Sequence, residues 1–359
     1  MNFELSDEAR MLQDGLRRFL RETYDAKTRN AAAEAPQGFP RAVWDGLAEM
    51  GVIGALFTED QGGFGGTGFD IALVFEELGR AGAVDPMLDT GVLCGGLLAE
   101  LGDTEAVEGV IAGGTQLALA HGEPGARYDS STAETAAARD GDAWRLTGRK
   151  AVVVNAAAAE AFLVTARTDA GLGLFRVEAA ALDFRPYPLN GGGTAAELAL
   201  DAAPATLLAE EAGAILARAE ARATLAICAE ALGLMEAIRG LTADYLKTRK
   251  QFGQPIGKFQ VLQHRMADML IEIEQARSAV INLAGNLDGP DRDLHVAATK
   301  NLIGEVARLV VEESIQMHGG IGMTMEYDLG HLAKRLTMVD HRFGDALHHL
   351  ERFIALRAA

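Results

Sequence analysis

The sequence predicts a mainly helical α+β protein with a helical N-terminal domain, a small antiparallel β-barrel domain in the middle and a C-terminal four-helix bundle. Three observations predict this order. Apolar residues recur at helical spacing up to about residue 110, short β-prone runs separated by turns follow, and helical periodicity then returns to the end of the chain. We therefore expect domains at residues 1–111, 112–205 and 206–359.

The N-terminal region begins with an amphipathic helix. Ser6 stands before the acidic pair Asp7 and Glu8, a pattern typical of a helix N-cap, and apolar residues such as Leu12 and Leu16 follow at helical spacing. A second helix is expected after Pro40, followed by a glycine-dense loop over residues 60–69 and by further helices up to about residue 100.

The middle region contains short β-prone runs, and the C-terminal region contains long alanine-rich ones. Runs such as Ala151–Val154 and Ala161–Thr165 are separated by Gly, Asp and Asn, which is typical of strands joined by turns. Beyond residue 206 we expect four antiparallel helices, at 209–249, 259–287, 292–318 and 328–357.

Composition limits the classes of partner. The net charge is −18 with a pI near 4.9, and no basic patch is visible, so binding to nucleic acid or to an anionic membrane is disfavoured. No apolar run approaches the roughly 20 residues that span a bilayer, and the N-terminus lacks the pattern of a secretory signal. Cys94 and Cys228 lie in apolar stretches without metal-ligand spacing. We expect a cytoplasmic protein.

Three motifs carry a resemblance to a known family. The segment Thr248-Arg-Lys-Gln-Phe-Gly-Gln-Pro-Ile-Gly-Lys-Phe-Gln260 resembles the Arg-x-x-Phe-Gly-x-x-Ile-x-x-x-Gln signature of the acyl-CoA dehydrogenases. Gln316–Met323 resembles the second glycine-rich turn of that family, and Glu123-Pro-Gly125 resembles its Thr-Glu-Pro-Gly loop. The likeness extends from Leu5 to the C-terminus and implies the acyl-CoA dehydrogenase fold.

The resemblance implies that FAD is the cofactor. In the family the signature arginine contacts a cofactor held mainly by a neighbouring subunit, a role that falls on Arg249 here. By the same resemblance, Phe252 and Gln260 line the adenine half of that site, and contacts to the diphosphate come from Gln316, Gly319 and Gly320. The chemistry agrees, because a diphosphate needs cationic donors and glycines that let the backbone approach. The structural alternatives are a helix cap for Arg249, a core position for Phe252 and a helix end at Gly319.

Two departures from the family concern the flavin ring. Gly122 stands in place of the threonine of the Thr-Glu-Pro-Gly loop, and the stretch Lys150–Asn155 lacks the tryptophan of the family's Trp-x-x-Asn motif. The flavin pocket of this chain is therefore expected to be altered or emptied. Glu123 is a candidate cofactor contact, although Glu-Pro-Gly also forms a turn without any ligand.

The usual catalytic base is missing. Removal of hydrogen next to a thioester needs a base for the α-proton while the β-hydride passes to flavin. The family's glutamate position falls on Phe343, and the alternative position used by some relatives falls on Ala223. Asp345 and Asp340 are the remaining candidates; Asp345 lies two residues from the vacant position, with a simple turn as its structural alternative. His348 and His349 are adjacent and point apart on a helix, so no metal site is predicted.

The C-terminal segment resembles the small subunits of heteromeric acyl-CoA dehydrogenases, such as pimeloyl-CoA dehydrogenase and the steroid side-chain enzymes. The resemblance implies an acyl-CoA substrate, an electron-transfer flavoprotein as acceptor and a homologous large subunit in an α2β2 assembly. Three hypotheses about function stay open. The first is a catalytic dehydrogenase subunit, which either obtains its base from a partner subunit or forms a homo-oligomer using Asp345. The second is a non-catalytic subunit that completes a partner's FAD site, and the third is a scaffold that binds CoA or an acyl carrier without flavin.

Overall fold

The computed structural model describes residues 6–141, 143–324 and 326–358. The chain forms two compact units. One combines the N-terminal segment up to Ala26 with Gly68–Ala83 and the chain from Thr224 onward, and the other contains Lys27–Thr67 and Val84–Ala223. The helix α7 (Gly213–Thr248) begins in the second unit and continues into the first. The predicted three-domain division stays a prediction.

The N-terminal helices follow the sequence pattern closely. They are α1 (Asp7–Thr23), α2 (Ala26–Glu34), α3 (Arg41–Glu49), α4 (Gly68–Ala81), α5 (Gly96–Glu100) and α6 (Thr104–Ile111), with a π-helical segment at Met87–Gly95. The predicted N-cap is confirmed, because the Ser6 hydroxyl accepts a hydrogen bond from the backbone N–H of Ala9 at 3.2 Å.

A small barrel forms the β region. Its strands are β1 (Leu117–Ala120), β2 (Ala136–Asp140), β3 (Ala143–Val154), β4 (Ala161–Arg167), β5 (Leu172–Glu178), β6 (Tyr187–Pro188) and β7 (Thr194–Ala209). The strand order is β1-β4-β2-β3-β7-β5, and the pairing of β4 with β5 closes the ring. Side chains such as Phe162, Phe175 and Leu198 fill its interior.

The expectation of a purely antiparallel sheet is wrong for two pairs of strands. β1 runs parallel to β4, with Leu117 opposite Ala161, and β2 runs parallel to β4 through Ala136 and Arg167. The chain leaves β1 and returns beside it only after the β2–β3 hairpin, so β4 enters in the same direction as β1. Alternation of apolar residues identifies strands but not the direction of their partners.

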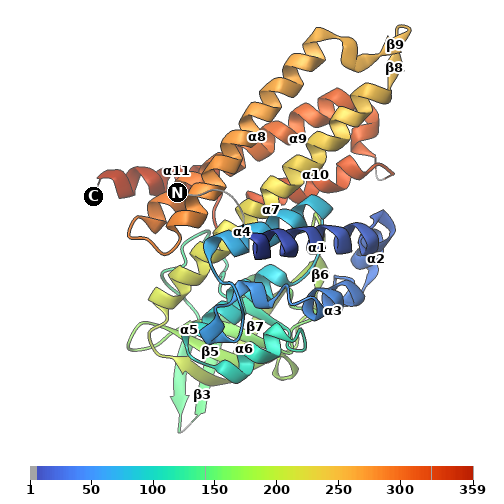
Figure 1. Cartoon of the computed structure of the whole chain (residues 1–359). Helices are drawn as coiled ribbons and strands as arrows, with labels where there is room; N and C mark the ends of the chain where they lie inside the picture. Colours follow the sequence, from blue (N-terminus) through green and yellow to red (C-terminus); the bar gives the residue numbers. More distant parts are fainter. Residues whose placement is uncertain (1–5, 142, 325, 359) are drawn as a thin grey trace. The chain divides into compact units, whose positions relative to one another are not determined.

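The C-terminal bundle contains α7, α8 (Gln260–Asn286), α9 (Arg292–His318), α10 (Asp328–Val339) and α11 (Ala346–Ala358). A hairpin of β8 (Lys250–Gln251) and β9 (Gln254–Pro255) joins α7 to α8 and projects beyond their ends (Figure 1). The prediction of one helix over 328–357 is wrong, because Phe343 and Gly344 adopt left-handed φ angles of 56° and 100° that interrupt the helix.

Helix α4 packs into the bundle at backbone distance. A Cβ at Gly79 would lie 2.0 Å from the carbonyl oxygen of Glu230 on α7, and a Cβ at Gly233 of α7 would lie 2.0 Å from the carbonyl oxygen of Glu76. A Cβ at Gly68 would likewise meet the Ala284 carbonyl of α8 at 2.3 Å. Glycine is therefore required on both sides of the α4–α7 crossing.

Candidate functional site

The hairpin after α7 places an aromatic side chain in solvent. Phe252 and Gly253 form the two-residue loop, and their φ angles of 51° and 78° match the left-handed pair that tight hairpins need. A non-glycine residue in this region is strained by about 1–2 kcal/mol. Phe252 is 89% exposed, and its ring contacts the edge of Phe259 at a centroid distance of 6.1 Å. Neither strain nor exposure serves the fold, so Phe252 is a candidate for contact with another molecule.

Arg249 lies at the base of this hairpin, where hydrogen bonds fix its backbone while its side chain extends into solvent. Its N–H donates to the Tyr245 carbonyl at 2.8 Å, and its own carbonyl accepts from the Ile256 N–H at 2.8 Å. The guanidinium is exposed and makes no hydrogen bond or ion pair with the residues that the structure describes. Gln260, the first residue of α8, is also exposed. Both side chains remain free for a ligand.

The turn after α9 supplies an open stretch of backbone. Gly319 ends the helix with φ 67° and ψ −149°, a conformation that only glycine adopts readily. A Cβ at Gly319 or Gly320 would meet nothing within 4 Å, so the backbone there can be approached closely from outside. Gln316 is exposed on the last turn of α9. The structural alternative, a helix end, is therefore also present and is compatible with a binding role.

Aromatic stacking brings these two groups to one end of the bundle. The Tyr245 ring of α7 stacks on the imidazole of His318 of α9 with centroids 4.4 Å apart, and Tyr327 packs against His318 at 5.3 Å. Because Tyr245 lies one turn before Arg249 and His318 lies directly before Gly319, the predicted cofactor residues of the hairpin and of the glycine turn share this end.

Asp345 lies beside the middle of α9, away from the Gly319 end. The Lys300 ammonium of α9 donates to the Gly344 carbonyl at 2.7 Å, and the stretch of α9 from Lys300 to His318 is roughly 27 Å long. Asp345 Oδ1 accepts a hydrogen bond from the His348 N–H at 2.8 Å and so caps α11. The structural alternative of a turn is present at Phe343–Asp345, and the carboxylate already has a partner inside the chain.

A groove of about 520 Å³ lies beside this turn. It is lined by residues of α9, α10 and the start of α11, among them Gly304, Arg308, Thr337, Asp340, His341 and Asp345. Two of its four carboxylates cap the turn: Asp340 Oδ1 accepts the Ala346 N–H at 3.1 Å, and Asp345 Oδ1 accepts the His348 N–H. Phe343, the position to which the family's base was assigned by resemblance, is not among the residues that line this groove.

Glu123 is committed to the interior of the β-barrel unit. Its carboxylate accepts hydrogen bonds from the Lys150 ammonium at 2.6 Å and from the N–H groups of Glu134 and Thr135 at 2.6 and 3.0 Å. Burial would raise the pKa of Glu123, but these donors outweigh it and lower the pKa to about 2. Burial also lowers the pKa of the neighbouring His121 to about 4, which keeps that ring neutral near pH 7.

This arrangement makes Glu123 a structural counter-ion whose carboxylate is almost completely buried and bound inside the chain. Its predicted contact with a cofactor stays a prediction and would have to use the backbone of the Glu-Pro-Gly turn. Val152 occupies the tryptophan position of the Trp-x-x-Asn motif, with φ 51° and 55% exposure. Asn155 is instead buried and donates to the Thr90 hydroxyl and the Leu117 carbonyl at 3.1 and 3.2 Å.

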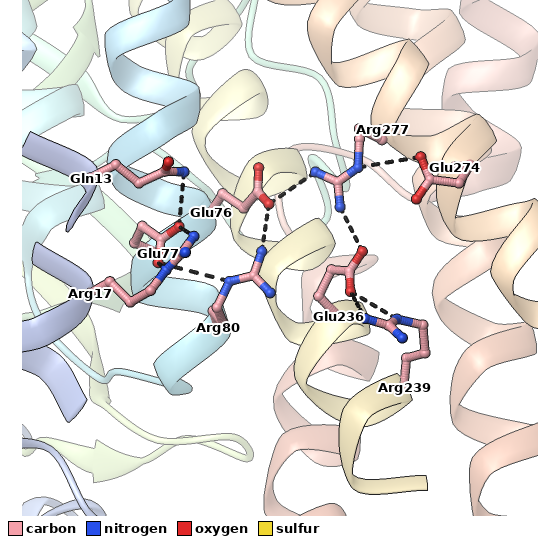
Figure 2. A network of polar contacts seen from close by, with 9 residues as sticks. All are labelled: Gln13, Arg17, Glu76, Glu77, Arg80, Glu236, Arg239, Glu274 and Arg277. Atoms are coloured by element: carbon pink, nitrogen blue, oxygen red, sulfur yellow. Dashed lines mark hydrogen bonds and ion pairs between the residues drawn. The ribbon is translucent and has the colours of Figure 1, made fainter. Parts of the chain in front are cut away.

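Sequence reasoning missed a charged network inside the bundle unit. Figure 2 shows four arginines facing four glutamates across α1, α4, α7 and α8: Arg17, Arg80, Arg239, Arg277, Glu76, Glu77, Glu236 and Glu274. Glu77 accepts from Arg17 at 2.6 Å, and Arg277 bridges Glu76 and Glu236 at 3.0 and 2.6 Å. Burial would raise the pKa of Glu236, but Arg239 and Arg277 outweigh it and lower that pKa. The charges balance, so the network holds helices together and leaves no net charge for a ligand.

Other site types find no support in the part of the chain that the structure describes. No group of histidine, cysteine, aspartate and glutamate side chains in residues 6–141, 143–324 and 326–358 is arranged to hold a metal ion. Within the same ranges, every helix is too short or too polar to cross a bilayer.

The chain is a protein of helices and a small β-barrel, in which an exposed arginine lies at the same end of the helix bundle as a glycine-rich turn. Comparison with known proteins identifies the family. Residues 6–112 match the N-terminal domain of acyl-CoA dehydrogenases, and residues 213–343 match their C-terminal domain. The chain belongs to the acyl-CoA dehydrogenase family.

Individual relatives cover almost the whole chain. A probable acyl-CoA dehydrogenase of Bacillus subtilis, YngJ, is 28% identical over 99% of both chains. A variant of the Tcur3481–Tcur3483 steroid ACAD is 31% identical with a TM-score of 0.90 over 98% of both chains. The ChsE4–ChsE5 complex of Mycobacterium tuberculosis contains a chain that is 26% identical, with a TM-score of 0.90 over 100% of this chain and 99% of that one.

Proposed function

We propose that the chain is one subunit of a heteromeric FAD-dependent acyl-CoA dehydrogenase, which removes hydrogen from the α and β carbons of an acyl-CoA thioester. In this assembly it completes the FAD site of a homologous subunit through Arg249, Phe252, Gln260, Gln316, Gly319 and Gly320. The observation that carries the proposal is the unpaired, exposed Arg249 guanidinium at the same bundle end as the open Gly319–Gly320 backbone.

These residues fit the diphosphate end of the cofactor. A guanidinium forms paired charge-assisted hydrogen bonds with phosphate oxygens, and two glycines without a neighbour on the Cβ side admit a phosphate close to the backbone. They lie roughly 21–27 Å along α9 from Gly304 and Lys300, which contact the 340–345 turn, so the two sets of residues face different parts of a ligand. A site shared between subunits accounts for both.

The flavin-ring end of the family site fits less well in this chain. Gly122 and Val152 replace the threonine and tryptophan of the two family motifs, and the Glu123 carboxylate is used by Lys150. When FAD is bound, its flavin ring accepts the hydride from the β carbon of the substrate. We therefore assign the ring, together with its covering residues, to the partner subunit.

The base is also assigned to the partner. Phe343 and Ala223 cannot take a proton, and the Asp345 carboxylate accepts a backbone hydrogen bond at the start of α11. In the alternative of a homo-oligomer, the Asp345 carboxylate would act as base while it also caps α11. Asp345→Asn in the assembled enzyme tests it: full turnover removes Asp345 as base, whereas a loss of several orders of magnitude supports the alternative.

The proposed partners follow the same resemblance. Two of the similar structures carry two-part names, Tcur3481–Tcur3483 and ChsE4–ChsE5, which supports a heteromeric assembly here, with α2β2 as the proposed stoichiometry. The steroid relative supports a steroid side chain or a fatty acyl group as the thioester's acyl part. An electron-transfer flavoprotein is the proposed acceptor, and the cytoplasm the proposed location.

Two measurements test the proposal. The chain is purified alone and together with a co-expressed homologous subunit, and the visible absorbance of flavin and the turnover of a panel of acyl-CoA esters are recorded. We expect colour and activity only in the pair. A yellow and active lone chain would contradict the partner assignment.

Arg249→Ala in the assembled protein tests the cofactor role. Loss of a charge-assisted pair costs about 1.5–3 kcal/mol, so we expect flavin to bind roughly 10- to 100-fold more weakly. Lys250→Ala is the matched control, because Lys250 is an exposed cation on the next residue of the same hairpin. Equal flavin content in the two variants would show that Arg249 has no such role.

A further inference from the structure

The turn between α10 and α11 has its backbone carbonyls directed into the protein rather than into solvent. The Lys300 ammonium, whose side chain is 0% exposed, donates to the carbonyls of Gly344 at 2.7 Å and of Asp340 at 3.2 Å. Both carbonyls belong to the segment that interrupts the last helical stretch of the bundle. One buried cation therefore holds the two ends of this turn.

Two further side chains complete the same bracing. The buried imidazole of His349 donates from Nε2 to the Phe343 carbonyl at 2.7 Å, and Asn301 Nδ2 donates to the Ala346 carbonyl at 2.9 Å. The carbonyls of Asp340, Phe343, Gly344 and Ala346 thus all accept bonds from α9 or α11. Phe343 is held with φ 56° between them, in a region that a residue with a side chain rarely adopts.

Burial of the Lys300 ammonium beside this turn costs free energy, so its presence needs a structural reason. A buried ammonium loses its hydration, and the nearest carboxylate oxygen, Asp340 Oδ1, is 3.8 Å away, too far for a strong ion pair. Burial accordingly lowers the pKa of Lys300, an effect that the Cys228 thiol and the carboxyls of Asp340 and Asp345 only partly oppose. An apolar side chain would fill the space more cheaply but could not bind carbonyls.

We propose that Lys300, together with His349, is the positioning residue of the 340–345 turn, fixing Phe343 in its left-handed conformation and setting the adjoining wall of the groove beside α9. Asp340, His341 and Asp345 of this turn line that groove, so a shift of the turn changes the groove's shape. The bracing itself is independent of the activity; its effect on turnover rests on the proposed function.

The test compares two buried lysines. Lys300→Met removes the donor and keeps the length of the side chain, and Lys150→Met is the matched control, because Lys150 is equally buried but lies in the barrel beside Glu123. Amide hydrogen exchange is measured in peptides covering residues 338–350. We expect exchange at least tenfold faster there in Lys300→Met and unchanged exchange there in Lys150→Met.

A second pair of variants keeps the test decisive if Lys300→Met does not fold. His349→Leu removes the donor to Phe343 and should accelerate exchange in the same peptides, whereas His349→Gln keeps an N–H donor and should restore slow exchange. Unchanged exchange in both Lys300→Met and His349→Leu, or equal acceleration in Lys150→Met, would overturn the proposal.

Turnover in the assembled enzyme separates this inference from the proposed function. The proposed function assigns the flavin ring and the base to the partner subunit, so we expect kcat per bound flavin in Lys300→Met to stay within about twofold of the wild-type value. Flavin content should not change either, because the proposed cofactor residues lie at the Gly319 end of α9, away from Lys300. Faster exchange together with a fall in kcat of about tenfold or more would keep the bracing but reject the assignment of the reaction to the partner, whereas an inactive wild-type assembly would reject the proposed function alone.

Discussion

Two regions along α9, its Gly319 end and the stretch around Lys300, use polar groups in opposite ways. At the Gly319 end, the Arg249 guanidinium has no partner among the described residues, and the Cβ sides of Gly319 and Gly320 face open space. Around Lys300, an ammonium, an imidazole and an amide are all used on carbonyls of the same chain. Unpaired exposed groups contribute nothing to folding, whereas buried groups must be paired. This difference in pairing distinguishes residues that are available to bind another molecule from residues that stabilise the fold.

The largest expected effect concerns pH at the braced region. Burial lowers the pKa of His349 to about 4 from 6.5, so the unfolded chain takes up this proton at a higher pH than the folded one. The contribution of neutral His349 to the free energy of unfolding is therefore complete above about pH 6.5 and is lost as the pH falls toward 4, with a magnitude on the order of 3 kcal/mol. In denaturant titrations, the free energy of unfolding of the wild type should fall by about this amount more than that of His349→Gln between pH 6.5 and pH 4. Equal losses in the two proteins would mean that the pKa of His349 is not lowered by burial.

A matched pair of glycines compares the two regions of α9 directly. A Cβ at Gly304 would lie 2.2 Å from Asp340 Oδ1 and 3.0 Å from the Ala346 Cβ, so Gly304→Ala must displace the braced turn. We expect it to lower the free energy of unfolding by about 1–3 kcal/mol. Gly320→Ala meets nothing within 4 Å and should change stability by less than about 0.5 kcal/mol. Equal losses in thermal unfolding would remove the distinction between the regions.

The smallest effect is expected at the hairpin tip. Phe252→Asn places a residue that tolerates the left-handed region before Gly253, and it should stabilise the isolated chain by about 0.5–1 kcal/mol despite the lost contact with Phe259. The same change should weaken flavin retention in the assembled protein, because the exposed ring is proposed to contact the cofactor. Destabilisation of the isolated chain would instead give Phe252 a folding role.

Local sequence signals predicted the elements whose cause is local. The Ser6 cap, the helices of the bundle and the barrel strands follow from spacing and turn residues, and the family motifs led to Arg249 and Gly319. The parallel pairing of β1 with β4 could not be predicted, because strand direction depends on the path of the chain between them. The break at Phe343 was also missed, since only the buried Lys300 and His349 make that left-handed residue stable.

The buried cations were invisible for a related reason. Lys150 and Lys300 look like ordinary surface lysines in their sequence neighbourhoods, and burial becomes evident only when their partners in other elements are in place. The same holds for Glu77, which is buried against Arg17 from a helix about 60 residues earlier. Residues that act through distant partners carry no local pattern.

The crossing of α4 with α7 has a consequence for how the protein is made. The carbonyls that meet Gly79 and Gly233 belong to segments more than 150 residues apart in the chain, so the ribosome must complete α7 before α4 can reach its final contact. Until then the part of α4 around Glu76 and Gly79 lacks the neighbour that its glycine is shaped to meet. A fragment ending after the barrel would lack α7 permanently, so truncation at this point should give a protein prone to aggregation rather than a smaller folded one.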